Sequence, residues 1–277
     1  MAQHSNSQFV LRNFADTDGR LYFFDQSAPG SRVRKWPPKR LFSQDHLYST
    51  IERNGTRSDD LDKFYQKLET RAAPIAKKII ASARGGRLPC LSAVEKQDWD
   101  LFVYNHWRRA PDCFEKFAYD EQALRDTIAE FERECRPLTA EERLYWEQSG
   151  TIATFWHNAC VDALKKQNLQ VLGILNSRGL GIAVIKKPNK GFITGSFPVV
   201  KLTNPETPHL GHPSTEAWLA LTPDVAVTPA GERSEERVVF VEDDHHIRSL
   251  NEALCRQSTV IAGRSKALIA SLAGVRA

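Results

Sequence analysis

The sequence predicts an α+β fold in which a helical middle region packs on a mainly antiparallel C-terminal sheet. Between residues 59 and 168, apolar residues recur at three- and four-residue spacing, which places them on one face of each helix. After residue 168 the period changes to short β-branched and apolar runs separated by turns. Hydrophobic residues make up 41% and charged residues 26% of the chain, as in ordinary globular proteins. We expect one domain over residues 1–277.

Residues 1–58 are predicted to form a mixed N-terminal segment. Asp16–Gly19 is typical of a tight turn, and a short strand follows at Leu21–Phe24. Residues 32–40 then hold five basic side chains and no acid. Pro37-Pro38 lacks amide donors, so a central strand is disfavoured there.

The helical region is predicted to begin at Ser58 or Asp59 and to contain several helices. Pro74 lies inside the first apolar pattern and removes one backbone hydrogen bond, so we expect a kink or break near residues 70–74. Ser92 with Glu95, and likewise Thr139 with Glu142, have the spacing of a capping box. Further helices are expected from Ser92 to before Pro111, over about 119–134, and over 140–167.

Residues 169–277 are predicted to form the sheet and the closing helices. Pro188–Gly191 is a turn signal that favours a hairpin between the strands on either side. Strands are expected at 171–175, 181–185, 192–202, 218–221, 225–227 and 238–241. Closing helices are expected at 247–256 and 267–272.

Several functional classes are disfavoured. The sequence contains no apolar run of membrane-spanning length and no signal peptide, so we expect a cytoplasmic protein without a membrane partner. The five cysteines lack metal or redox spacing, which favours reduced thiols. The sequence contains no Walker loop, dinucleotide fingerprint or serine nucleophile elbow, so the cofactor is unknown. A net charge of +4 does not require a nucleic-acid partner.

The basic stretch is nevertheless a candidate contact surface for nucleic acid or another phosphate-bearing ligand. Its cations would hold phosphates while its tryptophan stacks on a base. The alternative is a solvated loop whose tryptophan is anchored in the core. The candidate residues are Arg32, Arg34, Lys35, Trp36, Lys39 and Arg40.

Three groups containing histidine were weighed as chemical sites. Asp243–His246 and the His209/His212 pair hold ligand types without the third or fourth partner that a zinc site needs, so no metal site is predicted. The first group also suits a helix start with aspartate as the cap. Arg40 and His46 have the spacing found in some helical ribonucleases, in which arginine holds a phosphate and histidine moves a proton; this requires a helix.

Motifs spread along the chain resemble one family. The opening His4-Ser-Asn-Ser-Gln8, then Leu11-Arg-Asn-Phe14 and Asp18-Gly19, resembles the start of the bacterial and fungal family called domain of unknown function 4238. The resemblance extends from about residue 4 to 265. Further motifs that carry it are Leu68–Ile75, Trp107-Arg-Arg-Ala-Pro111, Phe192–Val199 and Ser249-Leu-Asn251.

The sequence departs from the family pattern twice. Ser5-Asn6-Ser7 replaces the usual Tyr-Val-Pro, and Ser196-Phe197 replaces the usual Asp-Asn. If the missing aspartate is catalytic or binds metal in relatives, this chain has lost or altered that activity. If it only caps a turn, Ser196 can form the same local bonds.

The resemblance implies a catalytic group of His4, Gln8, Arg12, Ser196 and Asn251. The first three lie four residues apart and would share one face of a helix. That face would meet the 194–198 turn and Asn251, with histidine carrying a proton and arginine holding an anion. In the structural alternative, His4 and Gln8 only tie the N-terminus to the sheet.

Two functions from different classes therefore remain open. The first is a nucleic-acid-acting hydrolase, a nuclease used as a bacterial toxin or defence effector. The second is a non-catalytic module that binds protein or nucleic acid. The Ser196-Phe197 departure favours the second.

Overall fold

The computed structural model describes residues 2–52, 54–112, 121–203, 209–212, 214–232 and 235–275. The helices are α1 (Gln8–Asn13), α2 (Asp60–Arg84), α3 (Ala93–Arg108), α5 (Glu121–Glu134), α6 (Ala140–Glu147), α7 (Thr151–Lys165), α8 (Leu169–Ser177), α9 (Asp244–Gln257) and α10 (Lys266–Ala273), with the 3-10 helix η1 (Pro38–Arg40). The strands are β1 (Ala2–His4), β2 (Leu21–Asp25), β3 (Arg34–Trp36), β4 (Ser43–Asp45), β5 (Thr50–Ile51), β6 (Arg57–Ser58), β7 (Arg178–Ile185), β8 (Thr194–Gly195), β9 (Val199–Leu202), β10 (Glu216–Thr222), β11 (Val225–Glu232), β12 (Arg237–Val241) and β13 (Val260–Gly263).

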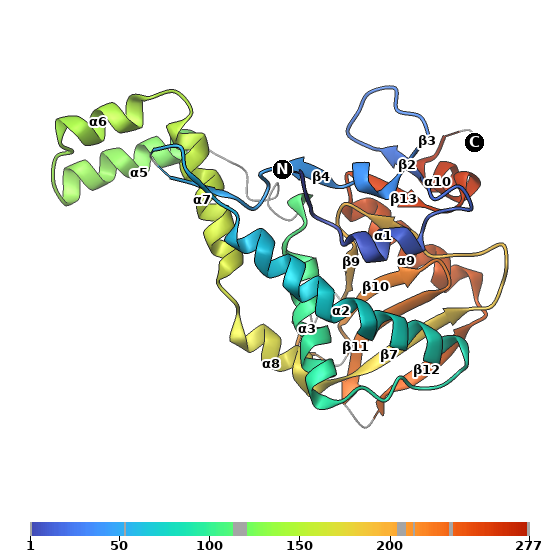
Figure 1. Ribbon diagram of the computed structural model, residues 1–277. Helices are drawn as coiled ribbons and strands as arrows, with labels where there is room; N and C mark the ends of the chain where they lie inside the picture. The colour runs from blue at the N-terminus through green and yellow to red at the C-terminus, as the bar shows by residue number, and fades with distance from the viewer. Residues whose placement is uncertain are drawn as a thin grey trace.

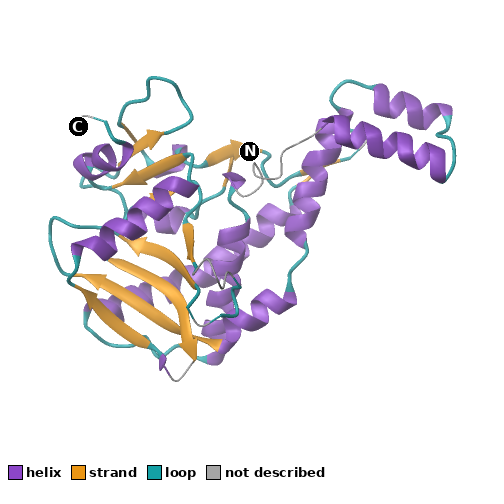
Figure 2. Ribbon diagram, turned by 180° about the vertical axis from the view of Figure 1, so that it is seen from behind, coloured by secondary structure: helices purple, strands orange, loops and turns teal. Residues whose placement is uncertain are grey.

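The larger sheet lies in the C-terminal half and has the strand order β12-β7-β11-β10-β9. Every pair in it is antiparallel except β12 with β7. Helix α2 crosses one face of this sheet and α9 lies on the opposite face (Figures 1 and 2). The α+β prediction is confirmed.

A second, four-stranded sheet joins the two halves of the sequence. Its order is β3-β2-β13-β8, so the N-terminal β2 pairs along its length with the C-terminal β13. Two further short antiparallel pairs are β1–β4 and β5–β6, of which β5–β6 packs against α7. Arg34–Trp36 of the basic stretch forms the edge strand β3, and β8 forms the opposite edge, with β2 and β13 between them.

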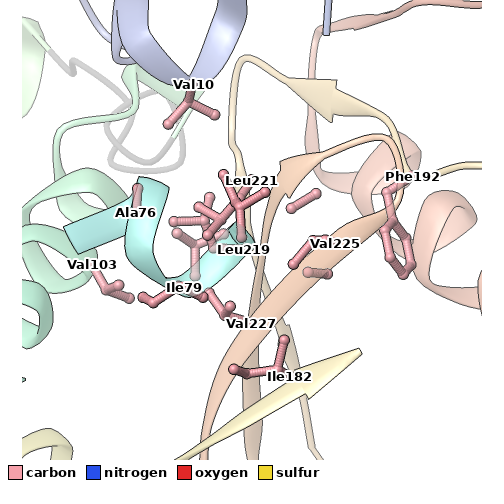
Figure 3. Packing of buried hydrophobic residues seen from close by; sticks show 14 of the residues in the cluster. Val10, Ala76, Ile79, Val103, Ile182, Phe192, Leu219, Leu221, Val225 and Val227 are labelled. Atoms are coloured by element: carbon pink, nitrogen blue, oxygen red, sulfur yellow. The ribbon is translucent and has the colours of Figure 1, made fainter. Parts of the chain in front are cut away.

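The largest apolar cluster draws on the N-terminal segment, on α2 and α3, and on the C-terminal half of the chain (Figure 3). Val10 from α1, Ile79 from α2 and Val103 from α3 meet Ile182 and Leu219 from the sheet. Apolar area removed from water contributes about 25 cal/mol per Å². The cluster therefore holds the N-terminal segment, the helices and the larger sheet in one arrangement.

Helices α5, α6 and α7 project from this body as an arm (Figure 1). No residue of α5 or α6 is buried. The predicted capping boxes at Ser92 and Thr139 are both present, with side-chain and backbone bonds in each.

Two of the predicted helices differ in extent from the expectation. The expected helix over 140–167 is two helices, α6 and α7, since Gly150 takes a φ of +82° and ends the continuity. Pro74 does not break α2, which runs from Asp60 to Arg84.

Four errors concern the strands. Val171–Leu175 lies in α8, because Asn168 accepts hydrogen bonds from the amides of Gln170 and Val171 and caps a helix there. Pro188–Gly191 does not connect a hairpin, since β7 pairs with β11 and β12 whereas β8 pairs with β13. The expected strand over 192–202 is two short strands in different sheets, and β13 was not predicted.

Candidate functional site

The N-terminal candidates do not share a helix face. His4 ends strand β1, whereas α1 begins at Gln8. The His4 Nε2 atom lies 3.2 Å from the Lys39 carbonyl oxygen, and Gln8 Nε2 donates to the Pro38 carbonyl at 3.3 Å. Both side chains therefore bind the backbone of Pro38 and Lys39, which belong to the basic stretch. Arg12 is exposed in the last turn of α1.

Asn251 is buried in α9 and holds a loop. Its Oδ1 accepts a hydrogen bond from the Ile193 amide at 3.1 Å, and its Nδ2 donates to the Gly191 carbonyl at 2.9 Å. These two bonds fix the backbone just before β8. They give Asn251 a positioning role in the fold.

Ser196 belongs to a buried polar group with Asp112 and Thr259, here named the Asp112 cluster. The Ser196 hydroxyl donates to the Asp112 carboxylate. Thr259 donates to the same carboxylate from its amide at 2.8 Å and from its hydroxyl at 3.0 Å. Ser196 Oγ also accepts from the Val260 amide at 3.1 Å. Three donors thus converge on one buried carboxylate.

The Asp112 cluster lies in a cleft of about 290 Å³, here named the β3 cleft. Arg34 and Trp36 from β3 and Arg40 from η1 line the same cleft. The structure therefore brings half of the predicted nucleic-acid residues together with Ser196, although they are more than 150 residues apart in sequence. Asp25, at the end of β2, is the second aspartate among the described residues that line the cleft.

Strand alternation explains which basic residues reach the cleft. Arg34 and Trp36 are two residues apart, so they point to the same side of β3. Trp36 is 37% exposed, and its ring centroid lies 4.6 Å from the ring centroid of Phe23. The guanidinium of Arg34 lies 5.6 Å from the Phe23 centroid, within cation–π range. Trp36 is thus a partly exposed strand residue and is not the core anchor of the alternative hypothesis.

The other three basic candidates do not line the cleft. Lys35 points away and forms ion pairs of 2.5 Å with Asp16 and 2.7 Å with Asp18. Hydrogen bonds to these two carboxylates raise the pKa of Lys35. Arg32 and Lys39 are exposed elsewhere on the segment.

A second polar network lies beneath the N-terminal segment and was not predicted. The buried Arg109 guanidinium donates to Glu69 at 2.6 Å, to the Ser7 hydroxyl at 2.8 Å and to the Ser5 carbonyl at 3.0 Å. His106 Nδ1 lies 3.1 Å from the same guanidinium. Burial and the charge of Arg109 hold the pKa of His106 well below its usual value.

The Ser5–Ser7 departure also has a structural role. Asn6 Nδ2 donates to Thr194 Oγ1 at 3.0 Å and to the Gly195 carbonyl at 3.2 Å. The N-terminal segment therefore does meet the 194–196 region, as hypothesised, but through Asn6 and not through a helix carrying His4. Ser5 itself lines the β3 cleft.

Sequence reasoning missed Asp112 and Thr259. Asp112 directly follows the Arg-Ala-Pro motif that ends at Pro111, and this position was the one available signal. Thr259 gives no signal, because its role depends on β13 lying between β2 and β8.

The remaining histidine and cysteine candidates have local partners. Asp243 caps α9 through the His245 amide, as expected, and His212 Nδ1 bonds the Ser214 hydroxyl at 2.6 Å. Residues 40–46 form a 3-10 turn and β4, so the helical ribonuclease arrangement is wrong.

Where the structure describes the chain, no three His, Cys, Asp or Glu side chains gather as metal ligands. The described cysteines are free, and Cys113 lies outside the described residues.

Comparison with known proteins identifies the family. No curated protein and no solved structure matches the chain. Within the described part of the chain, no helix has both the length and the apolar character needed to cross a bilayer. Residues 2–267 match one family, and the chain belongs to it: the family described as Protein of unknown function (DUF4238).

Proposed function

We propose that the protein is a non-catalytic module that binds single-stranded nucleic acid in the β3 cleft. The observation that carries this proposal is the meeting of Arg34, Trp36 and Arg40 in one cleft with the polar Asp112 cluster. A cleft of about 290 Å³ suits part of a strand, such as one nucleotide, and not a whole duplex.

Each wall of the cleft supplies a different interaction. The two arginines present planar guanidinium groups that suit phosphate oxygens. Trp36 offers an exposed ring for base stacking, which tolerates any base because every base has a π-face. Three protein donors already occupy Asp112, so of its roughly four acceptor sites about one is left for a sugar hydroxyl or a base amine. The arginines thus suit the phosphate of a nucleotide, the tryptophan suits its base, and the carboxylate suits its sugar.

Binding is favoured over hydrolysis by the positions of the proposed catalytic residues. His4, the proposed proton carrier, has its Nε2 engaged with the Lys39 carbonyl. Asn251 is bonded to the 191–193 backbone, and Arg12 is exposed on α1. Of the five candidates, Ser196 alone is among the described residues that line the cleft, and its hydroxyl donates to Asp112.

Fluorescence anisotropy with a labelled 12-nucleotide oligo(dT) or oligo(U) tests the proposal. We expect Trp36→Ala to weaken binding by about 1–3 kcal/mol. Two phosphate contacts predict a slope of log K against log salt of about −1.4, and Arg34→Ala is expected to reduce it by about 0.7. Arg12→Ala is the matched control, since Arg12 is an exposed arginine that does not line the cleft.

Equal losses in the Arg12 and Arg34 variants would show attraction by charge alone and contradict a defined site. A gel assay with and without divalent metal accompanies the titration. Cleavage of either oligonucleotide that Ser196→Ala abolishes would overturn the non-catalytic proposal in favour of the hydrolase.

A further inference from the structure

The face of the larger sheet that carries α9 has a floor of small side chains. Figure 2 shows α9 over one part of this face, with the strands beneath it in view. A groove of about 560 Å³, here named the α9 groove, lies between α9 and the sheet. Gly181 and Ala183 of β7 and Thr228 and Ala230 of β11 line it. Pockets that bind small molecules measure about 300–1,000 Å³, so the α9 groove has the size of a ligand site.

The walls of the α9 groove are apolar. Val239 and Val241 come from the edge strand β12, Trp218 from β10, Leu202 from β9 and Leu250 from α9. Sites of this kind bury the apolar body of a ligand and fix its orientation through a few polar groups. The polar and charged groups around the groove therefore decide which ligand fits.

Carboxylates outnumber cations among the described residues that line the α9 groove. Glu216, Glu242 and Asp243 are the acids, and Arg237 is the one arginine or lysine. His246 also lines the groove, and its Nδ1 atom lies 3.9 Å from an Asp243 carboxylate oxygen. The lining therefore favours a cationic ligand over an anionic one.

The charges that flank the groove do not reverse this balance. Glu235-Glu236 directly precedes β12 and adds negative charge at that end. Lys187 and Lys190 both bind the Asp244 carboxylate, each at 2.8 Å, so their charges are already paired. Lys186 Nζ lies 3.7 Å from an aromatic ring centroid of β12, where it forms a cation–π contact.

Glu216 and Trp218 form the polar end of the groove. They are two residues apart on β10, so they point to the same face of the sheet. Trp218 Nε1 donates to Glu216 Oε2 at 2.6 Å, which holds the carboxylate beside the indole, and both residues are half-buried. Arg237 begins β12, three strands away from β10, and neighbouring strands lie about 4.8 Å apart. Its charge is therefore remote from this pair.

We propose that the α9 groove binds a small organic cation with an aromatic body, whose ammonium group contacts the Glu216 carboxylate and the Trp218 ring. A carboxylate and an indole face both attract an ammonium group, and this attraction strengthens where water is excluded. The aromatic body packs on the small floor residues and against the apolar walls. The α9 groove lies on the larger sheet and the β3 cleft on the four-stranded sheet, so this proposal is independent of nucleic-acid binding.

Isothermal titration calorimetry of the full chain with three probes of one shape tests the proposal. Naphthylmethylamine is cationic, naphthylmethanol is neutral and naphthoate is anionic at pH 7. The amine is expected to bind at least about tenfold more tightly than the alcohol, a difference of about 1.4 kcal/mol, and the acid is expected to bind most weakly. Equal affinities, tighter binding of the acid, or no binding of the amine would overturn the proposal.

Two variants locate the site. Glu216→Gln keeps an oxygen that can accept from the Trp218 indole while it removes the charge, so it is expected to abolish the preference for the amine and to leave the alcohol unaffected. Ala183→Leu fills the floor and is expected to weaken all three probes at least about tenfold. Glu130→Gln is the matched control, since it removes an exposed carboxylate of α5 far from the groove lining.

Circular dichroism melts establish that each variant folds. If Ala183→Leu does not fold, the Glu216→Gln comparison still decides the outcome. A folded Glu216→Gln protein that keeps the full preference for the amine would overturn the proposal. Oligonucleotide binding is expected to be the same in this variant as in the wild type, which separates the two sites.

Discussion

At the scale of single residues, the N-terminal segment depends on a buried cation. Arg109 contacts Glu69, Ser7 and the Ser5 carbonyl, and it faces a histidine that is itself buried. Removing a charge from water is costly unless the charge is paired and hydrogen-bonded, and here four groups surround it. The carboxylate partner fixes the guanidinium, and burial together with the charge of the guanidinium lowers the pKa of His106.

This neutral histidine predicts a pH dependence of stability. The folded-state pKa of His106 is depressed, whereas its unfolded-state pKa is about 6.5. The unfolded chain therefore binds a proton that the folded chain does not, and stability falls as the pH drops below about 6.5. Between pH 7.5 and 5.5 this residue is expected to account for a loss of about 1.4 kcal/mol.

Urea denaturation at both pH values measures this effect. His106→Gln keeps a polar side chain that can accept from Arg109 and does not titrate. The wild type is expected to lose about 1.4 kcal/mol more than this variant on acidification. Equal losses in the two proteins would show that His106 is not held neutral.

At the scale of single residues, part of the candidate site could be predicted from the sequence. The basic stretch was visible as a run of like charges with a tryptophan, and Arg34, Trp36 and Arg40 do share a cleft. The equal spacing of His4, Gln8 and Arg12 suggested a helix face, but a three-residue strand and an extended link precede α1. Spacing alone cannot distinguish these cases, because β1 forms only by pairing with β4.

At the scale of elements, β8 and α9 approach each other at Gly195. A Cβ atom added there would lie 2.8 Å from Leu254 Cδ2 and closer still to Ser258 Oγ. Ser258 Oγ also accepts from the Phe197 amide, so it is not free to move away. The glycine therefore allows the close packing that places Ser196 beside Asp112.

Gly195→Ala is expected to destabilise the protein by about 1–3 kcal/mol through overpacking. Gly173→Ala in α8 is the matched control, since an added Cβ there has no atom within 4 Å. Alanine in a helix is more favourable than glycine, so this change is expected to stabilise by up to about 1 kcal/mol. Thermal melts of the two variants measure both shifts. A Gly195 variant as stable as the wild type would mean that α9 can move.

The sequence predicted well those elements whose formation depends on residues close together in the chain. The capping boxes depend on residues three apart, and both formed. Val171–Leu175 was read as a strand because its residues are apolar and partly β-branched, whereas the Asn168 cap and packing against α3 make it a helix. β13 is four residues long, and both of its partners lie far away in sequence.

At the scale of the whole molecule, the arm differs from the body. α5 and α6 bury no side chain, whereas α2 buries ten. Unfolding of α5 and α6 exposes no fully buried side chain, so the local stability of these two helices is expected to be low, whereas α7 buries Val161 and Leu164 against the body. Limited trypsin digestion followed by mass spectrometry checks this difference.

The first cuts are expected after Arg125, Arg133 or Arg143, before any cut in α2; trypsin does not cleave the bond between Arg136 and Pro137. Ion pairs of Arg136 with Glu142 and of Arg143 with Glu132 do not prevent this, because exposed pairs contribute little to stability. The nicked protein is expected to keep the melting temperature of the intact body. Early cleavage after Lys67 or Lys77 in α2 would contradict this order.

The pairing of β2 with β13 has a consequence for biosynthesis. Asn6 and Thr194 are 188 residues apart, yet they are bonded in the folded protein. A ribosome makes the chain from its N-terminus, so β2 emerges long before β13 and waits with an unpaired, apolar edge. This sheet can therefore close only after β13 has been synthesised, and until then β2 is expected to be prone to non-native contacts.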